Sequence, residues 1–275
     1  MNIGESAIMG AIQGLTEFLP VSSSGHLAIA QSLFGLTDPA SNLWFTVALH
    51  LATVLSSIVV FRREIWAIVR GTLRFTFNDQ SIYFLNIIIS MLPIMLVGLL
   101  FKDQIEALFA GKLILVGAML VVTAVLLTFS HFARAGVRPV TPKRAFVIGI
   151  AQAIAVLPGL SRSGATISAA LLQGVRRDEA ARFSFLMVII PILGMSLLDV
   201  AHVIRGGAAA MPADGGGSAG GFAVVLAVGF VVAFLTGLFA CRVMIKLVSR
   251  GKLIWFAAYC VLAGLTAITL GLLGL

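Results

Sequence analysis

Two serine-rich segments of the chain hold the residue types that can bind and cleave a phosphate group. These residues are Glu17, Ser22, Ser23, Ser24 and His26 in the first segment, and Ser161, Arg162, Ser163, Gly164 and Thr166 in the second. A carboxylate, an imidazole, hydroxyls and a guanidinium can together supply a nucleophile, a base and donors to an anion. Ionisable groups in strongly apolar surroundings are costly and usually functional, so we expect a site here.

Each serine-rich turn precedes a predicted helix, over residues 26–36 and 165–174. Serine at a helix start caps free backbone N–H groups. Two helix N-termini aimed at one point would form an anion site without any charged side chain. Arg162 lies in the second turn and adds a planar fork of donors suited to phosphate.

The same residues also have structural interpretations. Three adjacent serines are often only a helix cap, and a lone histidine in an apolar span, such as His50, is more often a packing residue. Glu17 and Arg162 could form an ion pair that merely joins two parts of the fold. The matching capped turns around Glu17 and Arg162 favour the functional interpretation.

The composition excludes a water-soluble globule and a disordered chain. Of the 275 residues, 60% are hydrophobic and 11% are charged, whereas soluble domains carry roughly 25% charged residues. The net charge of +8 would suggest a nucleic-acid partner in a soluble protein. In a chain this apolar it indicates cationic loops on one face of a membrane, and no nucleic-acid partner is expected. Cys241 and Cys260 lie in apolar stretches and predict neither a disulfide nor a metal site.

Six apolar runs are long enough to cross about 30 Å of hydrocarbon as helices. They cover residues 43–61, 81–101, 113–133, 183–204, 222–241 and 253–275. The runs are continuous and exceed the roughly 9–11 residues of a barrel strand, so we predict an all-α integral membrane protein. The first apolar segment has Glu5 as its only early charge, so we expect no cleavable signal peptide.

Four further apolar segments are too short to span, at residues 3–19, 24–36, 145–157 and 164–175. They form two pairs, and each pair is interrupted by Pro, Gly and a run of Ser. Short apolar segments in this setting are typical of re-entrant structure. We therefore predict two re-entrant helix–turn–helix hairpins in addition to the six transmembrane helices.

The basic residues are distributed unevenly over the predicted loops. If each hairpin enters and leaves on one side, one set of loops holds only Lys102, Lys112 and Arg205. The other set holds fourteen cations, which are Arg62, Arg63, Arg70, Arg74, Arg134, Arg138, Lys143, Arg144, Arg176, Arg177, Arg182, Lys246, Arg250 and Lys252. This asymmetry predicts a multi-pass membrane protein with cytoplasmic basic loops and both termini outside. We also expect residues 62–80 to lie on anionic lipid as a short amphipathic stretch and residues 206–221 to form a flexible outer loop.

The two serine-rich segments are related by a shift of 139 residues. The shift superposes Gly10, Gln13, Ser22, Ser24 and Gly25 on Gly149, Gln152, Ser161, Ser163 and Gly164. We therefore predict one membrane domain, residues 1–275, built from repeats of about 1–136 and 137–275. Each repeat holds one hairpin and three crossings, and because three is odd the second repeat must be inverted. Inverted repeats place their site near the midplane, and we expect that site to open to the outer face.

The segment from Gln13 to His26 (QGLTEFLPVSSSGH) resembles the first signature of the bacterial undecaprenyl-diphosphatase family, the bacitracin-resistance type. Residues 158–166 (PGLSRSGAT) resemble its second signature, P-G-x-S-R-S-x-x-T. The resemblance extends over essentially the whole chain. It implies hydrolysis of undecaprenyl diphosphate to undecaprenyl phosphate in the bacterial inner membrane, which recycles the lipid carrier of cell-wall synthesis. The functional residues that it implies are Glu17, Ser23, His26, Ser161, Arg162 and Thr166.

The resemblance also implies a divalent cation, Mg²⁺ or Ca²⁺, with Glu17 as a ligand. Position 13 is Gln in this chain where some family members have Glu, which removes one candidate carboxylate. Glu17 would therefore either hold the cation or orient His26.

The residue types suggest how a diphosphate would be held and attacked. Arg162 and the backbone N–H groups of both turns would hold it, because positioning and electrostatics dominate phosphoryl transfer. The remaining expected contacts are Gln13, Ser22, Ser24, Ser161, Ser163, Gly164 and Thr166. Ser23 is the expected nucleophile with His26 as base and then acid. A water activated by His26, or attack by His26 itself, stays open.

Two other classes of protein are compatible with part of this pattern. A polyprenyl-phosphate transporter or flippase would use the same anion site, because broken helices in inverted repeats are typical of secondary carriers. A scaffold or receptor with a structural polar core would show no turnover. The nucleophile and base that accompany the anion donors favour the enzyme, with a polyprenyl diphosphate as substrate and membrane lipid as surroundings. The oligomeric state cannot be read from the sequence.

Overall fold

The computed structural model describes residues 1–36, 39–101, 104–105, 108, 113–133, 136–204 and 219–273. Apart from one isolated β-bridge between Arg138 and Val175, the regular structure of the described residues is entirely helical. The predicted all-α class is therefore confirmed. Most of the predicted outer loop 206–221 lies outside the described residues, as do Lys102, Lys112, Arg134 and Arg205.

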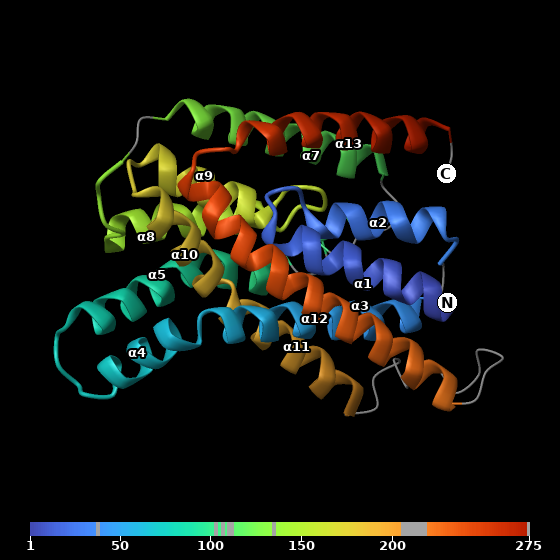
Figure 1. The fold of residues 1–275 in the computed structure, drawn as a ribbon, viewed down its shortest axis with the longest axis horizontal. Coiled ribbons are helices and arrows are strands. Elements are labelled where there is room, and N and C mark those ends of the chain that lie inside the picture. Colours follow the sequence, from blue (N-terminus) through green and yellow to red (C-terminus); the bar gives the residue numbers. More distant parts are fainter. Residues whose placement is uncertain are drawn as a thin grey trace.

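Twelve labelled helices make up the described fold (Figure 1). In chain order they are α1 (Ile3–Phe18), α2 (Ser23–Leu33), α3 (Pro39–Val60), α4 (Arg62–Thr72), α5 (Asp79–Leu100), α7 (Leu113–Phe132), α8 (Pro142–Ile154), α9 (Arg162–Leu172), α10 (Arg177–Met187), α11 (Ile189–Ile204), α12 (Ala219–Ser249) and α13 (Ile254–Leu272).

Five segments among the described residues are long and apolar enough to cross a membrane. They are α5, α7, α12, α13 and the combined α10–α11 segment from Arg177 to Leu198. A sixth crossing results if α3 and α4 count as one broken span, since residues Trp44–Val60 and Arg62–Thr72 meet at a bend of 76°. The chain is therefore a multi-pass membrane protein.

The structure differs from the predicted spans in two places. The span predicted at 183–204 is interrupted, because α10 ends at Met187 and α11 begins at Ile189. Pro191 lacks the N–H group that would bond the Met187 carbonyl, which explains the break. The span predicted at 222–241 is longer, since α12 reaches Ser249 and includes Lys246, one of the cations assigned to the loops. The first part of residues 62–80 forms the amphipathic helix α4, in agreement with the expected amphipathic stretch.

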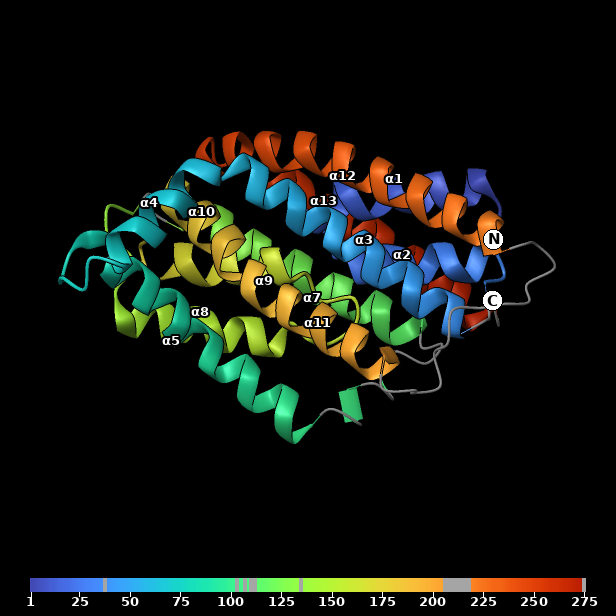
Figure 2. The same cartoon turned by 90° about the horizontal axis from the view of Figure 1, so that it is seen from below.

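The four short apolar segments form helices, as predicted: α1 with α2, and α8 with α9. The two hairpins extend from opposite ends of the molecule, and their turns meet in its middle (Figure 1). The start of α1 and the end of α13 lie at one end of the molecule, while α4 lies at the other (Figures 1 and 2).

Each hairpin packs mainly on a helix of the other half of the chain. Helix α1 packs against α12, and α8 packs against α5. Gly10 faces the backbone of Gly229, and Gly149 faces the backbone of Ser90. Both members of the first pair are 139 residues from their counterparts in the second, the shift seen between the serine-rich segments. Side chains larger than hydrogen at these glycines would separate the helices.

We expect Gly10→Ala to destabilise the protein, because the new Cβ would lie 2.5 Å from the Gly229 carbonyl oxygen. Overpacking of this kind costs about 1–3 kcal/mol. Gly98→Ala is the matched control, since a Cβ there meets no atom within 4 Å. Thermal unfolding in detergent, followed by the loss of helical circular dichroism, measures the difference. Equal midpoints for the two variants would contradict the close packing of α1 on α12.

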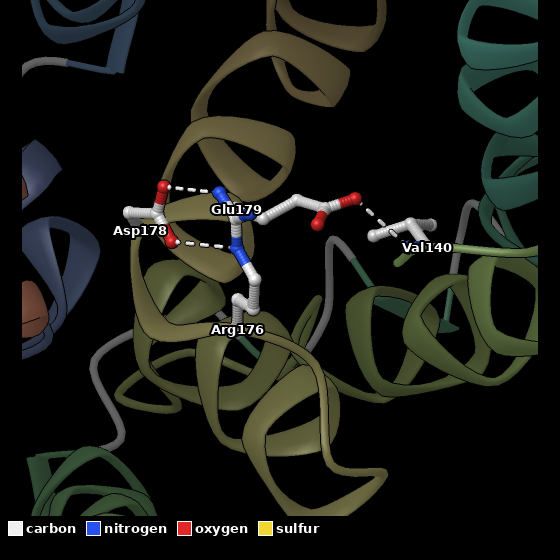
Figure 3. A network of polar contacts seen from close by, with 4 residues as sticks. All are labelled: Val140, Arg176, Asp178 and Glu179. Carbon is white, nitrogen blue, oxygen red and sulfur yellow. Dashed lines mark hydrogen bonds and ion pairs between the residues drawn. The ribbon is translucent and has the colours of Figure 1, made fainter. Parts of the chain in front are cut away.

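A group of polar contacts holds the second hairpin at the end of the molecule near α4 (Figure 3). Glu179 accepts a hydrogen bond from the backbone N–H of Val140 at 2.8 Å, which ties α10 to the segment before α8. Asn86 on α5 donates to the carbonyl of the same residue at 3.0 Å. Arg176 pairs with Asp178 through two hydrogen bonds at the start of α10. The contacts of Glu179 and Asn86 with Val140 hold the chain just before the start of α8.

Candidate functional site

The first serine-rich turn joins α1 to α2 through a constrained backbone. Ser22 is the N-cap of α2 and accepts a hydrogen bond from the Gly25 N–H at 3.2 Å. Its φ is +69°, a conformation that residues other than glycine rarely adopt and that costs free energy. The Ser22 carbonyl is held by His26, whose Nδ1 lies 2.8 Å away. Hydrogen bonds to the side chain and to the carbonyl of Ser22 therefore hold this backbone conformation.

The second turn repeats this capping. Ser161 is the N-cap of α9 and accepts from the Gly164 N–H at 3.0 Å. The Ser161 and Ser163 hydroxyls are 3.3 Å apart, the same distance that separates those of Ser22 and Ser24 in the first turn. The Ser161 N–H donates to Thr123 on α7 at 3.0 Å. The predicted correspondence of the two turns therefore extends to their hydrogen bonds.

The two turns touch at the centre of the molecule. The Ser163 hydroxyl donates to the carbonyl of Leu19 at 3.1 Å, which joins the hairpins directly. The first turn of α9 therefore contacts the segment between α1 and α2.

A cavity with about 390 Å³ of empty volume, part of it open to the outside, lies beside the joined turns. The polar side chains in its lining are those of Glu17, Thr53, Ser57, Arg162, Ser163, Thr166 and Ser184. The apolar side chains are those of Phe18, Val54, Phe185, Val188 and Ile192. A ligand that carries both an anionic group and an apolar chain matches such a lining.

Glu17 supplies the carboxylate among the residues that line the cavity. Its Oε2 atom accepts hydrogen bonds from the Ser23 hydroxyl at 2.6 Å and from the Gln13 amide at 3.1 Å. Arg162 and His50 both interact electrostatically with the carboxylate. Glu17 and Arg162 come from hairpins that are far apart in the sequence, and the cavity brings them together as predicted.

The expected pairing of Ser23 with His26 is not what the structure contains. The Ser23 hydroxyl donates to Glu17, whereas His26 Nε2 lies 2.7 Å from the hydroxyl of Tyr259 on α13. Neither Ser23 nor His26 is among the residues that line the cavity, but Ser23 is hydrogen-bonded to Glu17, which is. The reason is geometric, because the hydrogen bond from Nδ1 to the Ser22 carbonyl turns the ring toward α13. The carboxylate, and not the imidazole, is therefore placed to take the Ser23 proton.

Several expected phosphate contacts are engaged within the turns themselves. The Gly164 N–H bonds to Ser161, so it is not free for a ligand. The Thr166 hydroxyl donates to the Arg162 carbonyl at 2.9 Å, although Thr166 also lines the cavity. Ser22 and Ser161 are buried and serve as caps, and Ser24 bonds to Ser22. Of the expected contacts, Arg162, Ser163 and Thr166 reach the cavity.

Sequence reasoning missed the contribution of α3 and α10. Thr53 and Ser57 on α3 and Ser184 on α10 line the cavity, and His50 lies one turn from Thr53. The spacing of His50, Thr53 and Ser57 at i, i+3 and i+7 places them on one helix face. A row of polar residues on one face of an otherwise apolar span is the sequence signal that could have identified these lining residues.

The described residues contain no group of three or more His, Cys, Asp or Glu side chains that could hold a metal ion. One buried atom nevertheless lacks a partner beside Glu17: the Gln13 Oε1 atom accepts no hydrogen bond. A buried acceptor next to a carboxylate fits an oxygen-binding cation such as Mg²⁺ or Ca²⁺.

Comparison with known proteins supports the resemblance. The family model of bacitracin resistance protein BacA matches residues 6–266. The chain is 50% identical over 270 residues to a protein of Parabacteroides distasonis, with 98% of both chains covered. It is 49% identical over 269 residues to one of Christiangramia forsetii, again with 98% of both covered. It is 37% identical to one of Methanococcus vannielii, over 96% of this chain and 98% of the relative. All three relatives are named undecaprenyl-diphosphatase. With its paired serine-rich turns and a family match over nearly its whole length, the chain belongs to the bacitracin resistance protein BacA family.

Proposed function

We propose that this protein hydrolyses undecaprenyl diphosphate to undecaprenyl phosphate and inorganic phosphate in the cavity beside the two turns. The observation that carries the proposal is the Ser23–Glu17 hydrogen bond of 2.6 Å at a cavity that Arg162 also lines. Relatives at about half identity are named for this activity.

In this proposal the diphosphate lies against the polar side chains of the cavity. The Arg162 guanidinium carries a fixed charge and planar donors that match phosphate oxygens. The first turn of α9, whose Arg162, Ser163 and Thr166 line the cavity, adds a helix N-terminus, where the macrodipole favours an anion. The first isoprene units would lie against the apolar side chains of the lining, which include Phe18, Phe185 and Ile192.

Ser23 is the proposed nucleophile and Glu17 the base. The Ser23 proton moves to Glu17 as its oxygen bonds to the terminal phosphorus, and the bond from that phosphorus to the bridging oxygen breaks. Undecaprenyl phosphate leaves, and a phosphoserine remains. Water then attacks this phosphorus as its bond to the Ser23 oxygen breaks, and Glu17 returns its proton to that oxygen. Both protons of the water leave with the inorganic phosphate, so Ser23 and the Glu17 carboxylate are regenerated. Attack by water without a phosphoserine is the alternative, and it uses the same carboxylate.

A divalent cation, Mg²⁺ or Ca²⁺, is part of the proposal. Glu17 and the unpartnered Oε1 atom of Gln13 would hold it. When bound, it would neutralise negative charge on the diphosphate. Gln13 can serve in place of a carboxylate because amide oxygens also bind these cations.

We further propose that the two halves of the chain, about 1–136 and 137–275, form an inverted repeat with re-entrant hairpins. The reciprocal packing of α1 on α12 and of α8 on α5 supports this arrangement. Both termini would lie outside and the basic end near α4 in the cytoplasm, which agrees with their positions at opposite ends of the molecule (Figure 2). The cavity would then lie near the midplane, with access from the outer face.

The test is phosphate release by the purified protein in detergent. We expect release from undecaprenyl diphosphate, its loss on addition of a chelator, and its recovery when excess Mg²⁺ or Ca²⁺ is added. A transporter would bind the lipid without releasing phosphate, because detergent solution has no compartments. A folded preparation that releases no phosphate with any of these cations would overturn the proposed function. Full activity in the presence of chelator would overturn only the proposed role of the divalent cation.

A further inference from the structure

Tyr259 on α13 makes a contact with the first turn that the catalytic scheme does not use. Its hydroxyl lies 2.7 Å from His26 Nε2, and the two rings stack with centroids 5.5 Å apart and planes at 10°. Residue Cys260 beside it donates to the Pro20 carbonyl at 3.5 Å. Two adjacent residues of α13 therefore hold the turn between α1 and α2.

The hydrogen bonds define the state of the His26 ring. The Ser22 carbonyl can only accept, so Nδ1 must carry a proton and donate it there. In the neutral ring Nε2 is then an acceptor, and the Tyr259 hydroxyl is its donor. Both ring nitrogens are engaged by protein groups, so the ring bridges Ser22 to α13.

This bridge ends on the strained residue of the turn. Ser22 has a φ of +69°, and the backbone N–H of His26 also donates to its carbonyl at 3.2 Å. The next residue, Ser23, donates to Glu17 at 2.6 Å. A change in the Ser22 conformation would rotate the following peptide and move the Ser23 hydroxyl away from the carboxylate.

We propose that Tyr259 is a positioning residue for the phosphatase reaction. It holds the His26 ring, the ring holds the Ser22 backbone, and the backbone directs Ser23 at Glu17. His26 then acts through the turn and does not transfer the proton of Ser23. This inference rests on the proposed function, since it assigns Ser23 as the group to be positioned.

The kinetic test is Tyr259→Phe, which removes the hydroxyl and keeps the ring. The chain has two tyrosines, and Tyr83→Phe is the matched control because Tyr83 lies on α5 against Phe183, outside the cavity lining. We expect kcat of Tyr259→Phe to fall about tenfold with KM within about twofold, as loss of one hydrogen bond that acts on the reacting geometry predicts. The control should keep both constants.

A second variant separates positioning from proton transfer. His26→Asn keeps an N–H donor near the position of Nδ1, so it should retain more activity than His26→Ala. An amide cannot act as a general base. Equal loss in both variants would mean that His26 itself transfers the proton, and would overturn the inference.

A spectroscopic readout checks the contact without turnover. In the Tyr83→Phe protein made with 3-fluorotyrosine, Tyr259 is the single labelled residue. We expect its ¹⁹F resonance to shift when His26 is replaced by Asn and to stay unchanged in the distant variant Gly98→Ala. An unmoved resonance, or an unchanged kcat in Tyr259→Phe, would refute the positioning role. A rise in KM with unchanged kcat would refute it too, since Tyr259 would then contact substrate. Absence of phosphate release by the wild-type protein would instead reject the proposed function.

Discussion

Arg162→Ala is expected to lower phosphate release from undecaprenyl diphosphate by about a thousandfold or more. Arg162 lines the cavity together with Glu17 and begins α9. Charge on the phosphoryl oxygens must be stabilised in the transition state, and a single arginine contributes about 10³–10⁵ to the rate of comparable reactions. Steady-state kinetics of the purified variant, with folding checked by thermal unfolding, measure the loss.

Two further arginine variants make this prediction specific. Arg162→Lys should recover only part of the activity, because an ammonium carries the charge without the planar fork of donors. Arg242→Ala is the control, because Arg242 lies exposed on α12 and does not line the cavity. It should keep normal turnover. Near-normal turnover of folded Arg162→Ala would reject the role of Arg162.

Ser23→Ala should produce the second large effect, a loss of about a thousandfold or more, because it removes the proposed nucleophile. Ser24→Ala is the control at the next residue. The Ser24 hydroxyl lies 3.3 Å from that of Ser22, and the hydrogen bonds of the described residues include none between Ser24 and Glu17. We expect Ser24→Ala to lose less than about tenfold, as one neutral hydrogen bond predicts.

Acid quenching of the reaction with substrate labelled on its terminal phosphate tests the mechanism directly. Label should appear on the peptide that contains Ser23 and disappear in Ser23→Ala. If Ser23→Ala retains high turnover and no label is trapped in wild type, water attacks directly. Label on His26 would contradict the geometry, in which both nitrogens of that ring are engaged.

The sequence predicted the hairpins well for a physical reason. The apolar segments on either side of Pro20 and Pro158 are too short to span, and proline followed by serine and glycine favours a turn. The helices after the turns were predicted to begin at residues 26 and 165, but α2 begins at Ser23 and α9 at Arg162, three residues earlier in each case. The reason is that the first serine of each run is the N-cap, so the residues after it are already helical. The break near Val188 was missed because residues 185–193 are apolar throughout, and only Pro191 marks it.

The candidate site was predicted in part. Glu17 and Arg162 were expected at one place because both lie beside capped turns, and they line one cavity. His26 was expected to act on Ser23 because it follows three residues later in the same turn. Its ring instead turns to Tyr259, a residue 233 positions away. The positions of Thr53 and Ser57 in the lining could not be assigned without knowing which face of α3 meets the hairpins.

The sequence by itself determined that the protein lies in a membrane, where its helical segments are and which residue types its site contains, because these depend on local composition and spacing. The family followed from the same two motifs. The tertiary structure alone decided which hydroxyl meets which base, because that depends on side-chain directions at contacts between helices distant in the chain. It placed Ser23 on Glu17 and His26 on Tyr259. The direction of the His26 ring is therefore set by its contacts with the Ser22 carbonyl and with α13, and the second of these cannot be read from local spacing.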